Sequence, residues 1–490
     1  MRRADLNSSQ TGEKIVILGG GITGLTVAWE LSKNSELPVL LIEQNVSTGG
    51  LAGSFHRRDR IFDFGSHRIH EQYDPEVLGI IRELLGDELL KRPRRGQIRI
   101  QGKFLNYPPS ITQILTSFGL AQTIRLVRDF LLSRNNFFFI PHRATRPTPL
   151  TSFEEYATRA VGKSLYKSFY RPYALKLWGM SPAELSFEPA VSRVRKFELP
   201  AVWKELKNKA AGYTTSNSFY YPARGFGQIA EKILERFIDN GGEILFESSV
   251  QRLELKNDCE IEAIQVETRG VKSRRFSAKL LISTVPIDVL HQLVCSALGG
   301  ETVELGLSWR SLRILYLFTP DKIPSVHETY YFPEPDVIFG RVSEPAKYSP
   351  FLNQAGEKTA LVIEIPCTFG DEIWNLEDEV VAERCISDLR KLKILSPWST
   401  GDAEYFSRRI KNLYPVYKLG WREKLDEALR RFNSIKNLYC VGRPALFLHC
   451  NVDHCMAMGL KLARFLSAGS RTKEDWECSL GDVFSLSLHD

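Results

Sequence analysis

The sequence predicts an α/β fold, in which a Rossmann-like dinucleotide-binding domain is interleaved with a helical cap and a β-sheet substrate domain. Lys14 to Leu18 is an apolar run of strand length, and after a glycine-rich turn an amphipathic stretch begins at Leu25. A second strand-like run, Pro38 to Ile42, comes next. Strand patterns return much later, at Lys279 to Thr284 and Asn437 to Arg443. The nucleotide-binding sheet is therefore expected to be assembled from separated pieces of the chain.

The glycine-rich turn predicts a bound dinucleotide. Gly19, Gly21 and Gly24 follow the order G-x-G-x-x-G. Gly19 permits the turn, Gly21 leaves room for a pyrophosphate, and Gly24 lets helix and strand pack closely at the positive helix N-terminus. Glu43 ends the second strand about 20 residues further on, where a carboxylate accepts both ribose hydroxyls and repels a 2′-phosphate.

A second glycine turn selects FAD over NAD. Thr48 to Gly53 contains Gly49, Gly50 and Leu51, and Phe62 to His67 follows shortly afterwards. A flexible backbone at this point can approach the ribityl and isoalloxazine end of a long cofactor. We expect non-covalently bound FAD, and the alternative is a glycine-rich surface loop.

The last return of the chain is expected to complete the cofactor site. Gly442 follows a strand, and Asn451 to His454 supplies polar caps to a helix from Cys455 to Leu466. Such a helix, aimed at the flavin pyrimidine, would stabilise negative charge on reduced flavin, with Asp453 at its start. Val250, in a strand expected from Ser249 to Leu255, is included among the cofactor contacts.

Composition bounds the remaining possibilities. The 490 residues are 43% hydrophobic and 25% charged, which is typical of a globular protein of two domains. Lysine and arginine exceed aspartate and glutamate by 65 to 58, an excess that permits an anionic substrate and does not indicate nucleic acid. We expect no metal site, because no ligand spacing is convincing.

The cysteines and the lengths of the apolar runs indicate the cellular compartment of the protein. The eight cysteines form no C-x-x-C pair, which favours free thiols in a reducing cytoplasm. The first fourteen residues contain no apolar core of a signal peptide, and no apolar run approaches the length of a membrane span. Leu126 to Arg143 could touch a membrane surface, although a core helix followed by a strand or loop is favoured. We expect a cytoplasmic protein.

Domain boundaries follow from shifts in periodicity. Helical patterning dominates from about Pro75 to Lys207, and β-patterning is rich around Leu312 to Phe318 and Leu361 to Ile365. The expected organisation is FAD-binding domain at 13–75, 215–286 and 406–466, helical cap at 76–214, β-rich substrate domain at 287–405, and a tail at 467–490.

Five segments occur in a characteristic order: Gly65 to His70, Arg99 to Phe104 with Tyr107 and Pro108, Tyr173 to Gly179, Pro182 to Leu185, and Phe339 to Glu344. Together they resemble the flavoproteins related to UDP-galactopyranose mutase and to protoporphyrinogen oxidase-like or amine-oxidase-like enzymes, and the resemblance covers nearly the whole chain. It implies that His67 lies beside the flavin and that Arg341 binds a substrate diphosphate. It also implies a loop arginine, for which the counterpart is Arg193 or Arg195.

The carboxyl end departs from the mutase pattern. Mutases supply two tyrosines for the diphosphate after G-R, whereas here the positions fall on Phe447, His449 or Cys450. Arg443 and Asp453 are kept. This departure puts the binding of a UDP-sugar in doubt. The patterns G-R-x-x-L-F and N-x-D-H, which this chain carries, are commoner in protoporphyrinogen oxidase-like relatives.

Each candidate catalytic or substrate-binding residue has a plain alternative. His67 can relay a proton near the flavin, or be a hydrogen-bonded structural histidine. Arg341 can clamp an anionic group, or form a salt bridge with Glu344 or another acid. Trp178 can stack on a substrate ring, or belong to the core. The expected substrate contacts are Tyr173, Trp178, Arg195, Arg443 and His449.

Three functions remain open at this stage. The first is an FAD-dependent oxidoreductase that removes hydride from a small organic substrate, anionic or neutral, held between the nucleotide domain and the cap. The second is a redox-neutral mutase acting on a nucleotide-linked sugar. The third is a flavin-bound partner protein without turnover. No second strand-coupled G-x-G-x-x-G is present to hold a nicotinamide reductant.

Overall fold

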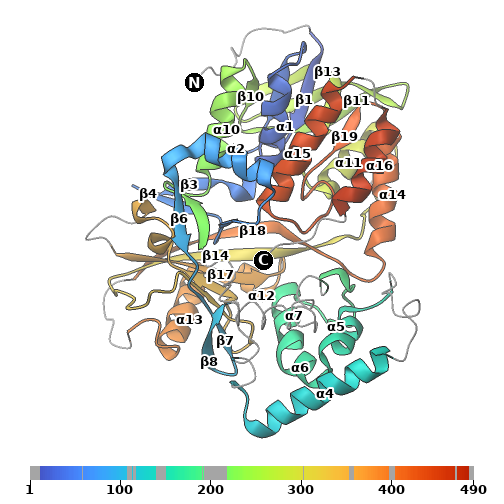
Figure 1. Ribbon diagram of the computed structural model, residues 1–490. Helices are drawn as coiled ribbons and strands as arrows, with labels where there is room; N and C mark the ends of the chain where they lie inside the picture. The colour runs from blue at the N-terminus through green and yellow to red at the C-terminus, as the bar shows by residue number, and fades with distance from the viewer. Residues whose placement is uncertain are drawn as a thin grey trace. The chain divides into compact units, whose positions relative to one another are not determined.

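The computed structural model describes residues 12–57, 59–107, 113, 117–138, 150–189, 191, 218–301, 303–352, 358–396, 403–469 and 472–484. It is a mixed α/β structure, as the sequence predicts (Figure 1). The chain divides into two compact units. Unit 1 comprises Met1–Leu90, Arg224–Leu307 and Arg422–Asp490, and unit 2 comprises Lys91–Ala223 and Ser308–Trp421.

The boundaries of these units lie later in the chain than the expected boundaries at 75, 214, 286 and 405. Helix α2 (Pro75–Leu85) contacts α10 and α15, and α11 (Ile287–Ala297) contacts β11, so both belong to unit 1. Strand β18 (Glu404–Val416) pairs with β14 and belongs to unit 2. Periodicity in the sequence does not reveal these long-range contacts.

A parallel sheet forms the centre of unit 1. Its strand order is β10-β2-β1-β13, with β19 on the other side of β13. Strands β1 and β2 are buried at every position, as strands covered on both faces must be. The bounds are β1 Lys14–Leu18, β2 Val39–Ile42, β10 Glu243–Leu245, β13 Val271–Ser283 and β19 Leu438–Cys440.

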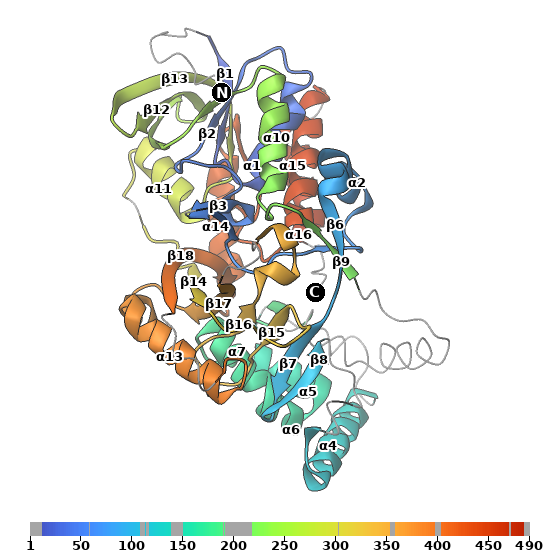
Figure 2. The same cartoon turned by 90° about the vertical axis from the view of Figure 1, so that its left-hand side faces the viewer.

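Helices cover one face of this sheet, and an antiparallel meander extends from it. Helix α1 packs beside α10 and α15 (Figure 1), and the meander with α11 lies on the opposite side (Figure 2). The bounds are α1 Ile22–Ser32, α10 Gln228–Asp239, α15 Val452–Ser467, β11 Ser248–Lys256 and β12 Glu260–Thr268.

Strand β13 joins the parallel part of this sheet to its antiparallel part. Residues from Ala278 onward pair with β1 in parallel, whereas those from Val271 to Ser277 pair with β12 in antiparallel. The sequence predicts only the buried end, Lys279 to Thr284. It misses the first half because that half alternates between exposed and half-buried positions.

Unit 2 is built on a seven-stranded sheet of order β18-β14-β17-β16-β15-β7-β8. Every neighbouring pair is antiparallel except β15 with β7. One face packs a core of aliphatic and aromatic side chains against α13 (Asp378–Lys391). The strand bounds are β7 Gly96–Ile100, β8 Lys103–Tyr107, β14 Ser308–Thr319, β15 Thr329–Tyr331, β16 Arg341–Ser343 and β17 Thr359–Cys367.

The helical part of unit 2 has its own core. Phe153, Tyr166, Tyr170 and Trp178 are each at most 2% exposed and pack together. The helices are α4 Leu120–Phe138, α5 Phe153–Val161, α6 Lys163–Leu165 and α7 Arg171–Trp178, with a π-helical turn at Tyr166–Tyr170 between the last two.

The helical patterning that was expected to dominate from about Pro75 to Lys207 is interrupted at Leu89 to Tyr107, which contains three strands. The hairpin expected from the resemblance is confirmed there: Ile100 pairs with Lys103, and Gln101 and Gly102 form its two-residue turn. Both turn residues have positive φ, 52° and 73°, as a type I′ turn requires. Residues 192–207 lie outside the described part of the chain.

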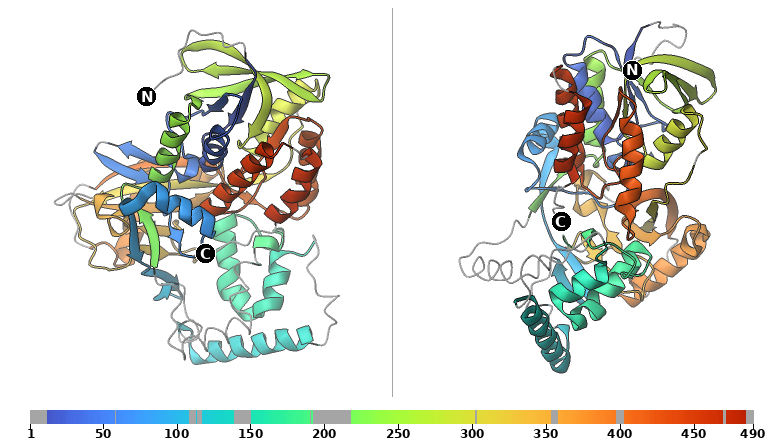
Figure 3. Two further views of the ribbon diagram at one scale, coloured as in Figure 1. Left: turned by 45° about the horizontal axis from the view of Figure 1, so that its top comes forward. Right: turned by 90° about the vertical axis from the view of Figure 1, so that its right-hand side faces the viewer.

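The other elements are short or peripheral. Helix α16 lies alongside α15 in unit 1 (Figure 3, left). Their bounds are β3 Ser54–Arg57, β4 Arg60–Asp63, β5 Ile69–His70, β6 Leu89–Pro93, β9 Ser218–Pro222, α12 Glu372–Asn375, α14 Trp421–Asn433 and α16 Lys473–Phe484. No helix within the described residues is long and apolar enough to cross a membrane.

Candidate functional site

The first glycine turn joins β1 to α1 as predicted, and its glycines have different roles. A Cβ on Gly24 would lie 2.0 Å from the Gly19 carbonyl oxygen, so any side chain there would force the turn apart. Gly19 has a φ of 97°, and a Cβ on it would meet Thr284 Oγ1 at 2.5 Å. A Cβ on Gly21, the N-cap of α1, would meet no atom within 4 Å. The space beside Gly21, at a helix N-terminus, fits a pyrophosphate.

Glu43 lies directly beside this turn. Its side chain is buried, and Oε2 accepts a hydrogen bond from the backbone N–H of Gly20 at 2.7 Å. Oε1 accepts bonds from Asn45, from the backbone nitrogen at 2.8 Å and from Nδ2 at 2.7 Å. A carboxylate has about four lone-pair sites, so acceptor capacity remains for a ribose hydroxyl. The Glu43 carbonyl accepts from the Ser248 N–H at 2.9 Å, which brings β11 and Val250 to the same end of the sheet.

The second glycine turn packs against the first. The Gly49 N–H donates to the Gly20 carbonyl at 2.8 Å, and a Cβ on Gly50 would lie 3.3 Å from Gly21 Cα. Gly49 and Gly50 have φ of 99° and 56°, and a short 3-10 turn follows, in which Leu51 is half-buried. The two turns that the sequence predicts to hold one cofactor are therefore neighbours.

A third glycine segment, which sequence reasoning left without a role, supports the second turn. A Cβ on Gly227 would lie 2.2 Å from the Ser54 backbone nitrogen. The Gly227 N–H donates to Ser54 Oγ at 2.7 Å, and the Phe226 N–H donates to Asp63 Oδ1 at 2.9 Å. The half-buried ring of His67 packs against Phe226, with ring centroids 4.9 Å apart. His67 thus lies in unit 1, close to the segment that supports the second turn.

The start of α15 brings a buried carboxylate to the same unit. The helix begins at Val452, three residues before the expected start, because Asn451 is the N-cap and forms a capping box with His454. Asp453 is 1% exposed, and its Oδ1 has no hydrogen-bond donor among the described residues. Burial raises the pKa of the Tyr73 phenol well above its usual value, and Asp453 adds to that effect.

Gly442 links this helix start to the first turn of α1. Its φ is 98°, and a Cβ on it would lie 3.0 Å from Thr23 Oγ1. Arg443 is half-buried and donates to the Cys450 carbonyl at 3.3 Å. Cys450 Sγ and Cys455 Sγ lie 3.8 Å apart, and both are buried free thiols.

An orphaned buried carboxylate oxygen, the open space at Gly21 and the spare acceptor sites on Glu43 together fit a dinucleotide. Asp453 would face a hydroxyl or N–H donor, Gly21 a pyrophosphate and Glu43 a ribose. The predicted cofactor residues His67, Val250 and Gly442 all belong to unit 1 as well.

Unit 2 holds Arg341 in a fixed orientation. Its Nε donates to Glu364 Oε1 at 2.8 Å and its Nη2 to Glu364 Oε2 at 2.5 Å. Burial acts to lower the pKa of Arg341, but the charge of Glu364, with the phenols of Tyr331 and Tyr414 nearby, raises it well above the usual value. Sequence reasoning named Arg341 and missed these three partners, which we call, with Arg341 itself, the Arg341 cluster.

The predicted substrate residues of unit 2 have different surroundings. Trp178 is 2% exposed and packs edge-on to Tyr414, with centroids 6.3 Å apart, which favours the core role left open by the sequence. Tyr173 is half-buried and stacks on Phe169. Arg195 lies outside the described residues.

Two cations that sequence reasoning missed anchor the helix carrying Trp178. Arg310 donates to the carbonyls of Leu177 at 2.9 Å and Lys176 at 3.0 Å, and so caps the C-terminus of α7. Lys176 Nζ donates to the carbonyls of Phe332 and Glu334 at 2.7 Å each. Burial lowers the pKa of Lys176 to about 7.

In the carboxyl-terminal segment of unit 1, the three residues at the positions expected to replace mutase tyrosines differ from one another in burial. Phe447 is fully buried, with a φ of 51°, and Cys450 is 5% exposed. Only His449 of the three is half-buried.

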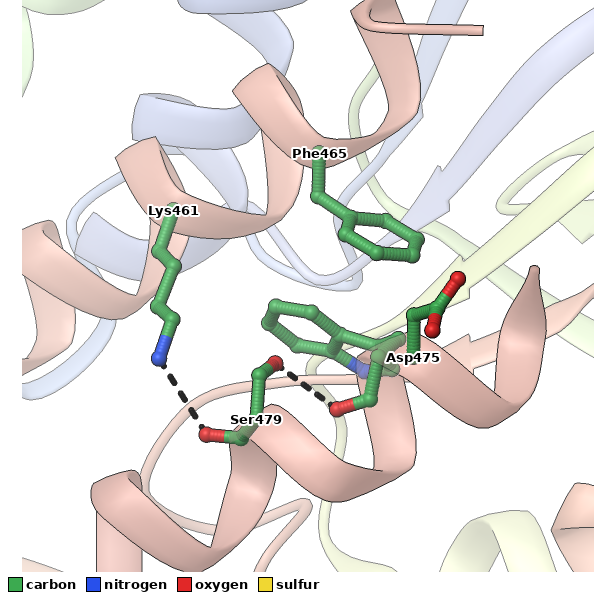
Figure 4. Close-up of a pocket in the computed structure, with 5 residues that line it drawn as sticks. Lys461, Phe465, Asp475 and Ser479 are labelled. Carbon is green, nitrogen blue, oxygen red and sulfur yellow. Dashed lines mark hydrogen bonds between the residues drawn. The ribbon is translucent and has the colours of Figure 1, made fainter. Parts of the chain in front are cut away.

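A recess in unit 1 lies elsewhere, between α15 and α16. It measures about 310 Å³ and is lined by Lys461, Phe465, Asp475, Trp476 and Ser479 (Figure 4). Lys461 Nζ donates to the Ser479 carbonyl at 3.2 Å, and the Phe465 ring packs on Trp476. None of the predicted site residues lines it. No group of three metal-ligating side chains occurs among the described residues.

Comparison with known proteins agrees with this geometry. The chain is 25% identical over 468 residues to the Klebsiella pneumoniae protein named "Probable UDP-galactopyranose mutase", covering 94% of this chain and 97% of that protein. A crystal structure of reduced UDP-galactopyranose mutase superposes with a TM-score of 0.75 at 22% identity, covering 94% of each chain. A protoporphyrinogen oxidase-like protein from Exiguobacterium superposes with a TM-score of 0.70 at 16% identity, covering 94% of this chain and all of that one.

A family model also matches most of the chain. Residues 22–448 match the model described as flavin containing amine oxidoreductase, which covers most of both units. The cofactor is therefore FAD, as the two glycine turns predict. The chain belongs to the family of flavin-containing amine oxidoreductases and is an enzyme of that superfamily.

Proposed function

We propose that this enzyme is a redox-neutral mutase that acts on a nucleotide-linked sugar. The sequence analysis ranked this activity second, after an oxidoreductase that removes hydride. Support for placing the mutase first comes from the Klebsiella relative, which is named for a mutase and is matched over 97% of its length. The third hypothesis, a partner protein without turnover, gains no support from the family match.

The observation that carries the proposal is the Arg341 cluster. A guanidinium has five N–H donors, and Glu364 takes two of those on Arg341. Three donors remain, and the Arg341 side chain is 26% exposed. A guanidinium that is held rigid and keeps free donors is suited to bind a phosphate oxygen.

The same cluster answers the doubt raised by the carboxyl end. Phenol donors are missing at Phe447, His449 and Cys450, but Tyr331 and Tyr414 supply phenols near Arg341 from other strands. Tyr331 is the direct cross-strand partner of Arg341, and the tilted ring of Tyr107 packs against Tyr331 with centroids 4.3 Å apart. Unit 2 therefore offers phenols and a cation together, which is the donor set that a diphosphate needs.

The roles of the residues in unit 1 follow from their contacts. Gly21 and the N-terminus of α1 would hold the pyrophosphate of FAD, and Glu43 the adenosine ribose. The buried Asp453 would accept a hydrogen bond from the cofactor. His67 would hold or move a proton near the second glycine turn. Bound FAD supplies a nucleophilic nitrogen when reduced, or a hydride acceptor when oxidised.

The test is an anaerobic assay with UDP-sugars, before and after reduction of the flavin by dithionite. We expect the two ring forms of the sugar to interconvert only after the flavin has been reduced, with no net change in flavin absorbance. Chromatography of the sugar nucleotides measures this interconversion. Arg341→Gln should raise KM about ten- to a hundredfold. Arg275→Gln, which removes an ion-paired arginine on the surface of unit 1, should leave KM unchanged.

The second candidate is the hydride-removing oxidoreductase. The replacement of the expected tyrosines by a buried Phe447 and by His449 favours it, as does the structural likeness to a protoporphyrinogen oxidase-like protein. Bleaching of oxidised flavin once per substrate molecule, without isomerisation after reduction, would establish this activity and reject the mutase.

A further inference from the structure

Helix α4 carries an apolar stripe that the fold of unit 2 does not use. Leu120 is 80% exposed, Ile124 59%, Val127 41% and Leu131 57%. Their spacings of four, three and four residues place them within about 60° of one another on a helix that turns 100° per residue. Leu132, also exposed, lies beyond one edge of the stripe.

The opposite face of α4 fixes the helix to its unit. Leu126 is 4% exposed and packs with Ile98, Ile100 and Phe118. Asp129 Oδ2 accepts a hydrogen bond from Ser164 Oγ at 2.5 Å. All the ribbon views show α4 at an outer edge of the helical part of unit 2, with α5 and α6 on one side only (Figures 1 and 3). The apolar stripe therefore lies away from the contacts that hold the helix.

Positive charge flanks the stripe. Arg125 and Arg128 are exposed. On a helix that turns 100° per residue, Arg128 lies between the stripe and Leu132, and Arg125 lies about 20° beyond Leu132. Arg128 also forms an ion pair with Asp129, 3.1 Å from Nη2 to Oδ1. Asp129, which belongs to the packed face, is the one acidic residue in the sequence from 120 to 150, and that stretch contains arginines at 125, 128, 134, 143 and 146. The sequence around the end of the helix is also rich in aromatic residues, with Phe137, Phe138 and Phe139 in succession.

We propose that α4 is a docking surface for a lipid bilayer that carries anionic lipids. A helix with an apolar stripe and flanking arginines lies in the plane of the membrane interface, with the stripe among the acyl chains and the arginines at the headgroups. The helix has 19 residues, about 28 Å at 1.5 Å per residue, and its charged positions suit a surface orientation.

The charges favour a bilayer over a second copy of the chain. Two α4 helices that met through their stripes would bring the arginines of one helix toward those of the other, and Asp129 already pairs with Arg128, so no carboxylate of the helix is left to compensate Arg125. Anionic headgroups supply that compensation. This proposal does not depend on the activity proposed above.

The test is co-sedimentation of the full-length holoenzyme with vesicles of phosphatidylcholine, with and without phosphatidylglycerol. We expect binding only with phosphatidylglycerol, and weaker binding at high salt. The double variant Ile124→Glu/Leu131→Glu should lower the partition coefficient about a hundredfold. Arg125→Gln/Arg128→Gln should lower it about 25-fold, near fivefold per charge.

Matched controls separate the stripe from general surface effects. Val326→Glu adds a carboxylate at a position of unit 2 that is 62% exposed, and Arg159→Gln removes an exposed arginine of α5. Both should bind vesicles like the wild type, and all variants should keep their melting temperature and flavin spectrum. Equal binding by Ile124→Glu/Leu131→Glu, or no binding by the wild type, overturns the proposal. A wild-type dimer that this variant converts to monomer, without vesicle binding, assigns the stripe to an interface between copies instead.

Discussion

Arg341 and Glu364 are direct partners on adjacent antiparallel strands, and two hydrogen bonds of 2.8 and 2.5 Å lock the guanidinium against the carboxylate. The pair is charge-balanced, and three N–H donors of Arg341 have no hydrogen-bond acceptor among the described residues. In the proposed substrate site Glu364 would act as a positioning residue, and its loss should have a different kinetic effect from the loss of Arg341.

Arg341→Lys should weaken substrate binding about ten- to a hundredfold, because an ammonium cannot reproduce the planar fork. Glu364→Gln should raise KM less, about tenfold, since the cation survives but loses one fixed contact. Steady-state kinetics on the reduced enzyme would separate KM from kcat. Unchanged KM in both variants would remove the Arg341 cluster from the substrate site.

Gly21→Val and Gly24→Ala should fail in different ways. A side chain at Gly21 meets open space in the protein, so we expect a folded, colourless protein that no longer retains FAD. A Cβ at Gly24 would lie 2.0 Å from the Gly19 carbonyl oxygen, so Gly24→Ala should destabilise the fold itself. Circular dichroism with FAD titration distinguishes these results. A yellow Gly21→Val protein would contradict the assignment of the pyrophosphate to this turn.

Glu43→Gln should destabilise both the turn and cofactor binding. The carboxylate accepts bonds from Gly20 and from two nitrogens of Asn45, and an amide would direct an NH₂ group at one of these donors. We expect a loss of about 1.5 to 3 kcal/mol in unfolding free energy, measured by urea denaturation. Glu235→Gln, on the exposed surface of α10, is the control and should change little. Equal stability of the two variants would argue against the buried network.

Lys176 should make stability depend on pH. Burial lowers the pKa of its amine to about 7 in the folded protein, from 10.5 as its ordinary value. Between these values the unfolded chain binds a proton that the folded chain does not, so stability rises with pH across this window. The neutral amine still has two N–H donors for the carbonyls of Phe332 and Glu334.

Denaturation of the wild type and of Lys176→Met at pH 6.5 and 8.5 measures this effect. From pH 6.5 to pH 8.5, the free energy of unfolding of the wild type should rise by about 2 kcal/mol more than that of the variant. Parallel pH profiles for the two proteins would show that Lys176 stays charged in the fold.

The sequence predicted those parts of the site that depend on local geometry. A glycine turn between a buried strand and a helix leaves a short-range pattern, and β1 begins and ends at the expected residues, Lys14 and Leu18. The need for glycine at positions 19, 21 and 24 of this turn then follows from backbone sterics alone. The second turn at Gly49 and Gly50 was found for the same reason.

Partners across strands were beyond the reach of sequence reasoning. The sequence analysis named Glu344 or another acid as a salt-bridge partner of Arg341; the partner is Glu364, and Glu344 pairs with Lys347 at 2.6 Å. Side chains three apart on a strand point to opposite faces, so a cross-strand residue such as Glu364 is the better-placed partner. Register between distant strands decides such contacts, and one sequence does not show it. Arg310 and Lys176 were missed because they bind backbone carbonyls, which leave no signal in residue type.

The layers that contain β1 and α1 are completed very late in synthesis. It pairs with β13, and β13 in turn pairs with β19 at Leu438–Cys440, while the first turn of α1 packs against α15. At translation rates of about 5 to 20 residues per second, the first strand waits on the order of 20 to 80 seconds for these partners. By then the residues up to α15 have been made. We therefore expect cofactor loading only after α15 has been synthesised, with the amino-terminal glycine turn unliganded until then.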